Sequence, residues 1–286
     1  MVALAHWLAA SRVRRAVFMA GLFPLPFVGM VSGAIVAMTA RISGFRAALF
    51  ECLAALAILA LLASFVGSSI GPVLGVAALS WVAIAALGSI VRVTLSLTLA
   101  IQAAVMMALL LLVGMEVVWG DSAAFWMPVL EGFYADLAQQ GVDVQVDIAA
   151  QAEITSAALI TGSLIAELFS LLIGMAWAGA VDGKLNGQSF TDLRLGNAIS
   201  LLAALVGLML FIDWPTAGAM LILGTAFMFQ GVAVLIWWSR RLGWPGGWGF
   251  GLMVVMLLVP QVFLLVTILL ATVGFIDNWY GLRHRA

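Results

Sequence analysis

Long apolar runs separated by short connectors dominate the chain. A helix needs about 20 residues to cross the hydrocarbon core of a bilayer, and eight runs approach or exceed that length. They cover residues 16–40, 46–66, 70–91, 94–116, 154–180, 195–212, 216–238 and 249–275. The runs lack the alternation of barrel strands. The pattern therefore predicts an all-α, polytopic transmembrane bundle that forms one integral membrane domain over residues 1–286.

The connectors show where the chain faces each side of the membrane. Connectors one, three, five and seven contain the basic residues Arg41, Arg46, Arg92, Lys184, Arg194, Arg240 and Arg241. The connectors 67–69, 117–153 and 213–215 contain no lysine or arginine. Because cytoplasmic loops concentrate these two residues, we expect the odd-numbered connectors to be cytoplasmic.

The two basic tails do not fit eight complete spans. Arginines lie just before the first run and just after the last one, although both tails should then be external. Pro24 and Pro26 interrupt the first run, and Pro260 interrupts the last. Proline removes a helical hydrogen bond, yet membrane helices tolerate it. Two hypotheses stay open: kinked but complete spans, or broken, re-entrant segments that keep the tails in the cytoplasm.

The connector 117–153 is acidic and contains apolar residues at helical spacing. This spacing predicts an amphipathic, extracytoplasmic helix that ends near Gly141. The helix could cover the mouth of the bundle as a lid, or it could be a plain solvated connector.

Composition supports a membrane location and excludes several functions. Hydrophobic residues make up 65% of the 286 residues and charged residues 9%, against roughly 25% charged residues in a soluble domain. The net charge of −1 gives no basic footprint for nucleic acid, so the expected partner is the lipid bilayer. Cys52 is the single cysteine and the two histidines lie near the chain ends. Catalytic and nucleotide-binding motifs are absent, so we expect no metal, no cofactor and no enzymatic activity.

One charged residue lies deep inside a predicted span. Glu167 shares a helix face with Ser163 and Ser170, and also with Ser156. A charged side chain at this depth costs about 3 kcal/mol or more unless it faces protein or a water-filled cavity. Glu167 is therefore a candidate substrate-binding or proton-carrying residue, with Ser163 and Ser170 beside it. The alternative is a protonated carboxyl that bonds to a neighbouring helix.

Other polar and small residues inside the runs are weaker candidates. Gln102, Gln230 and Gln261 can each join helices or contact a ligand. Gly29, Gly33 and Ala37 form a small-residue ridge that suits helix packing or partner docking. Glu51 lies near Arg46 and is expected to be a paired or snorkelled residue at the end of a span.

Short motifs along nearly the whole chain carry a family resemblance. They are PLP at 24–26, SGA at 32–34, RISG at 41–44, GQSF at 187–190, LRL at 193–195 and GFIDNW at 274–279, followed by Arg283. On these residues the chain resembles the YybS-like membrane proteins of bacteria, a family without an established activity. It departs from that family at 185–187, where Leu-Asn-Gly replaces an Asn-Pro-Gly turn.

The YybS-like proteins are remotely similar to the substrate-binding components of energy-coupling-factor transporters. The resemblance implies a multi-pass protein of the bacterial inner membrane that binds or transports a small molecule. It also implies an energising or partner membrane subunit docked on the ridge of Gly29, Gly33 and Ala37. The alternative function is a non-catalytic scaffold or assembly subunit, in which the polar residues only join helices.

Overall fold

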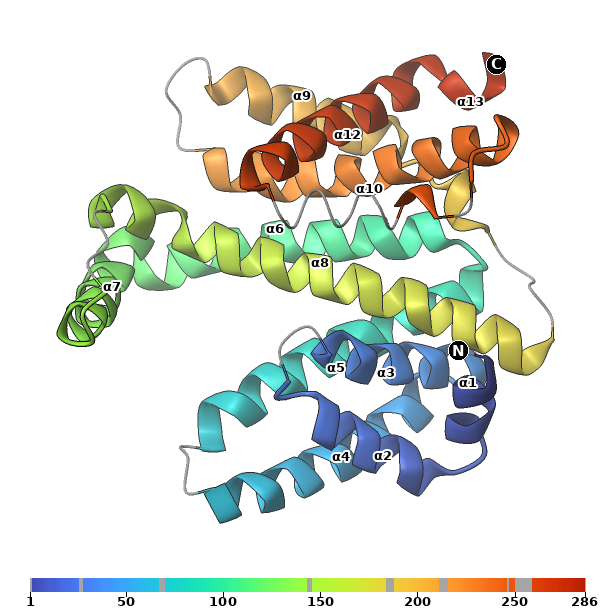
Figure 1. Cartoon of the computed structure of the whole chain (residues 1–286), viewed down its shortest axis with the longest axis horizontal. Coiled ribbons are helices and arrows are strands. Elements are labelled where there is room, and N and C mark those ends of the chain that lie inside the picture. The colour runs from blue at the N-terminus through green and yellow to red at the C-terminus, as the bar shows by residue number, and fades with distance from the viewer. Residues whose placement is uncertain are drawn as a thin grey trace. The chain divides into compact units, whose positions relative to one another are not determined.

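The regular elements of the protein are helices (Figure 1). In this computed structural model the residues described are 2–25, 28–66, 70–142, 146–183, 188–210, 216–245, 247–249 and 259–285, and within them no strand occurs. The chain divides into two compact units. Unit 1 comprises Met1–Ala104 and Ile165–Leu193, and unit 2 comprises Val105–Leu164 and Arg194–Ala286. Helices α6 (Leu97–Trp119) and α8 (Ile148–Asp182) contribute residues to both units.

Six helices among the described residues are long and apolar enough to cross a membrane. They are α4 (Phe45–Val66), α5 (Ile70–Thr94), α6, α8, α10 (Ala217–Arg241) and α12 (Pro260–Tyr280). A helix satisfies its backbone hydrogen bonds internally, which lipid requires. The prediction of an α-helical, multi-pass membrane protein is therefore confirmed. Part of the predicted span 249–275, residues 250–258, lies outside the described residues.

The predicted span 16–40 is two shorter helices instead of one. After α1 (Val2–Ala9), the chain forms α2 (Arg12–Leu22), a turn that contains Pro24, and α3 (Gly29–Ser43). Proline lacks the amide hydrogen that would continue the helix. At 1.5 Å per residue, α2 and α3 are about 16 and 22 Å long, less than the ~30 Å hydrocarbon core. Neither helix alone fills the predicted span.

The predicted span 195–212 is helical from residue 196 to residue 210, after which the described residues resume at 216. Helix α9 (Gly196–Leu210) has 15 residues, which gives a length of about 22 Å. The predicted outer turn at 213–215 lies outside the described residues. The expected count of eight spans is not confirmed, because the first run is divided and the described part of the run 195–212 is a helix of 15 residues.

Helix α3 occupies the interior of unit 1. Its residues 32–40 are all buried. Small residues on both neighbours make room for it: a Cβ at Gly88 of α5 would lie 2.9 Å from the Ala37 carbonyl oxygen, and one at Gly174 of α8 would lie 2.5 Å from the Ala37 Cβ. Close approach of backbones through small residues is typical of membrane helix contacts.

A buried ion pair joins α2 to α4 within unit 1. Arg15 donates from Nε to Glu51 Oε2 at 2.7 Å and from a terminal nitrogen to Oε1 at 2.5 Å. Thr39 of α3 donates to the same carboxylate at 3.2 Å. Arg15 also donates to the carbonyl oxygens of Leu8 and Ala9 at the end of α1. Of the two expectations for Glu51, the paired residue is therefore the one observed, and its partner Arg15 is 36 residues away in the sequence.

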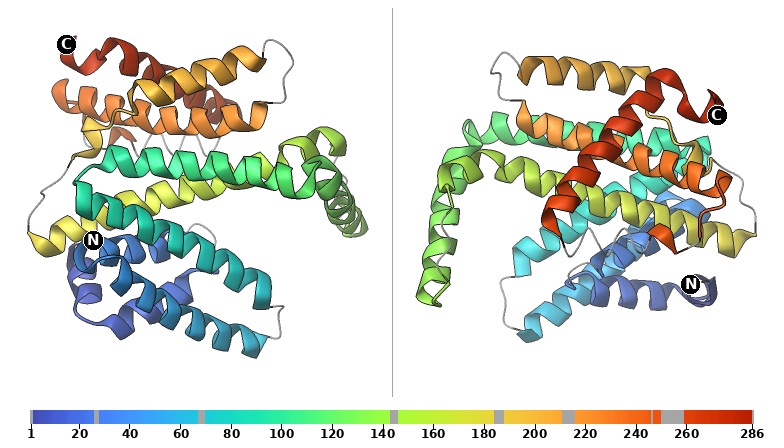
Figure 2. Two further views of the ribbon diagram at one scale, coloured as in Figure 1. Left: turned by 180° about the vertical axis from the view of Figure 1, so that it is seen from behind. Right: turned by 45° about the horizontal axis from the view of Figure 1, so that its top comes forward.

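Helices α10 and α12 pack closely in unit 2, where α12 crosses α10 (Figure 2, right). A Cβ at Gly231 would overlap the carbonyl oxygen of Leu270, and a Cβ at Gly274 would overlap that of Phe227. The Phe227 ring also meets Phe275 edge-on at 5.3 Å. The two glycines therefore permit a backbone-to-backbone contact at the crossing point.

The predicted helix in the connector 117–153 is confirmed as α7 (Ser122–Gln139). Asp121 caps it by accepting from the amides of Ala123 and Ala124, and Gly141 follows its end with a φ of +81°. Two side chains tie α7 to the first turns of α8, because Trp126 donates to Ser156 at 2.8 Å and Tyr134 donates to Gln151 at 2.7 Å.

Candidate functional site

Glu167 lies near the middle of α8 and its side chain is half-buried. Its helix carries no other charged residue between Glu153 and Asp182. Among the described residues of unit 1, no group donates a hydrogen bond to its carboxylate and no cation pairs with it. By contrast, the two buried carboxylates of the described chain, Glu51 and Asp277, each bind an arginine. Glu167 is thus a carboxylate in an apolar helix that forms neither a hydrogen bond nor an ion pair with the described part of unit 1.

The three serines on the same helix face as Glu167 have different surroundings. Ser170 is buried and donates to the carbonyl oxygens of Met30 in α3 and Ala166 in its own helix. Ser163 is exposed. Ser156 is buried and accepts the hydrogen bond from Trp126. The side chains of Ser170 and Ser156 therefore connect α8 to other helices. Among the described residues, the side chains of Ser163 and Glu167 form no such hydrogen bond.

The predicted small-residue ridge lies inside unit 1. Gly33 and Ala37 are buried, and a Cβ at Gly33 would lie 2.5 Å from Ser170 Oγ. A Cβ at Gly29 would lie 3.0 Å from the Phe23 carbonyl oxygen of the preceding turn. The contacts of Gly33 and Ala37 are thus contacts between helices of this chain.

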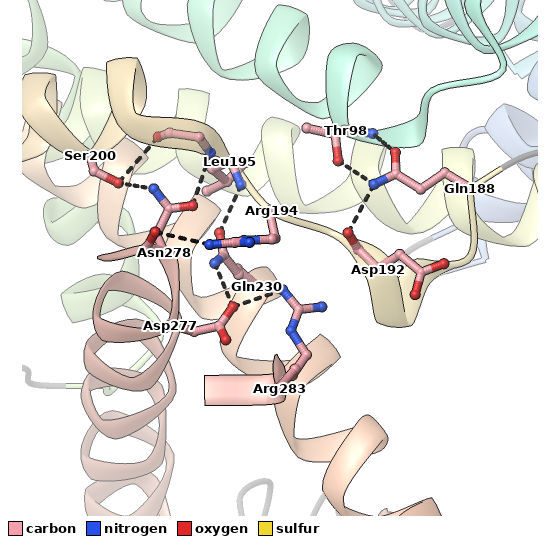
Figure 3. Close-up of polar contacts among 11 residues, drawn as sticks. Thr98, Gln188, Asp192, Arg194, Leu195, Ser200, Gln230, Asp277, Asn278 and Arg283 are labelled. Carbon is pink, nitrogen blue, oxygen red and sulfur yellow. Dashed lines mark hydrogen bonds and ion pairs between the residues drawn. The ribbon is translucent and has the colours of Figure 1, made fainter. Parts of the chain in front are cut away.

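A second polar centre surrounds Gln230 in unit 2 (Figure 3). Gln230 is fully buried in α10. Its side-chain oxygen accepts from the Leu195 amide at 2.9 Å, just before α9 begins, and its nitrogen donates to Asp277 Oδ2 at 3.0 Å. Gln230 therefore connects the start of α9 to the end of α12, with both ends of its amide occupied.

Asp277 and Asn278 complete this centre at the end of α12 (Figure 3). Arg283 donates to Asp277 Oδ2 at 2.7 Å. Asn278 accepts from the Gly196 amide at 2.9 Å and donates to Ser200. Asp277 Oδ1 is buried without a hydrogen-bond partner among the described residues. Apart from that atom the polar groups satisfy one another, as a network that fastens helix ends requires.

Sequence reasoning selected Gln230 but did not select Asp277, Asn278 and Arg283 as site residues. A usable signal was present: a carboxylate at the end of an apolar run, with a glycine and then an arginine a few residues on. Gly281 takes the left-handed conformation that ends α12, and the chain turn brings Arg283 back to Asp277.

Gln188 organises a polar turn in unit 1 that the sequence analysis also missed (Figure 3). Its side-chain oxygen accepts from the Thr98 amide at 2.9 Å, and its nitrogen donates to the Thr98 hydroxyl at 2.7 Å and to the Asp192 carbonyl at 2.9 Å. Its own amide donates to the carbonyl of Leu95, which has a φ of +57°. Gln188 thus stabilises the break between α5 and α6.

The remaining candidates do not join these centres through the bonds described above. Gln102 is half-buried on α6, and Gln261 is exposed in the first turn of α12. Among the described residues, no group of three or more His, Cys, Asp or Glu side chains is placed to hold a metal ion.

Comparisons with protein-family models, with curated proteins and with solved structures found no match for this chain. Its class therefore rests on its own features. The long apolar helices indicate a multi-pass membrane protein. The candidate site is the carboxyl of Glu167, which has no partner among the described residues of unit 1.

Proposed function

We propose that this chain is a membrane transport component that binds a small solute, or a proton, at Glu167. The observation that carries the proposal is the contrast between carboxylates. Glu51 and Asp277 are each neutralised by an arginine of their own unit, whereas the described residues of unit 1 provide no such partner for Glu167. Ionisable residues inside membrane helices are costly and mark ion, proton or substrate pathways. A carboxyl without a structural partner suits a proton, a cationic group or a hydrogen-bond donor of a solute.

The Glu167 site can be tested with an apolar carbodiimide, which reacts with protonated carboxyls inside membranes. We expect dicyclohexylcarbodiimide to modify Glu167, detected as a mass increase on its peptide. Glu51 should stay unmodified because Arg15 holds it as a buried ion pair. Absence of modification at Glu167, with modification elsewhere, would remove this residue from the proposed site.

Binding is tested by a thermal-shift screen of small cationic and polar solutes on the purified chain. A transported solute should raise the unfolding temperature of the wild type and protect Glu167 from the carbodiimide. Glu167→Gln should weaken that solute's binding at least tenfold, whereas Glu153→Gln, an exposed change on the same helix, should leave it unchanged. Equal binding by both variants contradicts the proposal. A chain that binds no solute but copurifies with a membrane partner would favour the scaffold function.

The proposal includes a location in the bacterial inner membrane with the basic connectors in the cytoplasm. Its support in unit 1 is the position of the arginines. Arg92 of α5 donates to the carbonyl oxygens of Arg41 and Ile42, so the first and third connectors lie at one end. Arg15 binds Glu51 in the second turn of α4. Helices α2 and α3 then enter and leave from this same end as a re-entrant hairpin.

We expect a fluorescent protein that folds only in the cytoplasm to be fluorescent when fused to the N-terminus. A periplasm-specific phosphatase inserted after Gly141 should be active, and it serves as the control for the opposite side. The physical reason is that α2 and α3, each shorter than the hydrocarbon core, together return the chain to the side on which α2 began. An external N-terminus would rule out the re-entrant hairpin.

A further inference from the structure

A groove of about 540 Å³ runs between α2 and α4 on unit 1. Arg12, Ser43 and Arg46 surround one end of it, and Phe50, Ala54 and Ile58 line the rest. One end is therefore cationic and hydroxyl-bearing, and the remainder is apolar. This division matches an amphiphile with an anionic head and a hydrocarbon chain.

The two arginines at the cationic end of the groove are without partners in the described part of the chain. Arg12 and Arg46 are exposed, and within the described residues neither has a hydrogen bond or an ion pair. Glu51 also borders the groove, but both its oxygens are bound by Arg15. The negative charge that would repel an anion is thus compensated, and two arginines remain available.

The apolar wall has the length of an acyl chain in one leaflet. Ala47, Phe50, Ala54 and Ile58 lie on successive turns of α4. Ile58 follows Ala47 by 11 positions, a rise of about 16 Å along the helix. That is about half of the ~30 Å hydrocarbon core. Phe50 is 73% exposed and Ala54 is exposed as well, so the described residues leave the middle of this wall open to the bilayer.

We infer that this groove binds one anionic phospholipid, with its phosphate between Arg12 and Arg46 and an acyl chain along Phe50, Ala54 and Ile58. Ser43 supplies a hydroxyl for a phosphate oxygen. Basic pockets between membrane helices on the cytoplasmic side suit lipid headgroups. A free phosphate would use the arginines alone and leave the apolar wall uncovered, so the two ligand sources differ in their use of the wall. This site is separate from Glu167 and does not depend on the transport function.

The lipid site is tested by native mass spectrometry of the full chain purified in detergent. The probes are phosphatidylglycerol, phosphatidylcholine with the same acyl chains, and glycerol 3-phosphate. We expect one phosphatidylglycerol to be retained in preference to phosphatidylcholine. Arg12→Gln with Arg46→Gln should weaken that binding roughly 10- to 30-fold, from the loss of two surface cations.

Two further variants test separately whether lipid binding depends on the arginines of the groove and on its open apolar wall. Arg240→Gln with Arg241→Gln removes the same charge from the end of α10 and should leave binding unchanged. Ala54→Trp keeps the charge but fills the groove from an exposed position, and should also abolish retention. Equal retention of both lipids, equal loss in both arginine pairs, or full competition by glycerol 3-phosphate would each overturn the phospholipid assignment.

Discussion

Replacement of Arg15 by glutamine is expected to lower the free energy of unfolding by about 3–5 kcal/mol. The variant leaves the Glu51 carboxylate buried at 6% exposure, with Thr39 as its remaining donor among the described residues. It also removes the donor to the carbonyls at the end of α1. An uncompensated buried charge costs far more than a surface pair contributes. Unfolding in mixed detergent micelles measures the loss.

The matched control is Arg14→Gln, because Arg14 is the exposed neighbour on the same helix. Its loss should cost less than about 1 kcal/mol. The double variant Arg15→Met with Glu51→Leu should recover most of the stability, since it removes both charges together. If Arg15→Gln costs no more than Arg14→Gln, or the double variant is no better than the single one, the ion pair does not hold α2 to α4.

Alanine at Gly231 is expected to destabilise the protein by about 3 kcal/mol. The added methyl would overlap the Leu270 carbonyl oxygen, and a backbone atom cannot move aside as a side chain can. The α10–α12 crossing must then separate. Gly274→Ala should behave alike, because its Cβ would overlap the Phe227 carbonyl oxygen. Thermal unfolding in detergent reports both effects.

Gly224 provides the control on the same helix. A Cβ there meets nothing within 4 Å, and alanine is favoured over glycine in a helix interior by about 1 kcal/mol. Gly224→Ala should therefore be neutral or stabilising, opposite in sign to Gly231→Ala. A stability change of the same sign and size at both positions would show that the crossing does not depend on Gly231.

Most of the helices could be predicted from the sequence, because a local run of apolar residues is enough to require a helix in lipid. Apolar runs such as 46–66 and 216–238 have to form helices in lipid whatever they pack against, and α4 and α10 occupy them. The break after α2 had a local signal in Pro24. The run 195–212 is helical over residues 196–210, which are the described residues of α9.

The partners of polar residues were beyond sequence reasoning because they depend on tertiary contacts. Glu51 had an arginine five residues away, yet it pairs with Arg15 across 36 residues. Gln230 could be chosen as a candidate because it is a polar residue inside a predicted span. Its partner Asp277 could not, because the two residues are 47 positions apart in the sequence. Glu167 was recognisable from its position alone, since its defining property is the apolar sequence around it.

The pairing of Arg15 with Glu51 also constrains how the chain is made. Arg15 leaves the ribosome 36 residues before its counter-charge, so the N-terminal helices cannot reach their final place in unit 1 while α4 is still unsynthesised. Until then Arg15 has water or lipid headgroups as its surroundings. We therefore expect α2 to reach its final position only after α4 enters the membrane, although α2 precedes α4 in the chain.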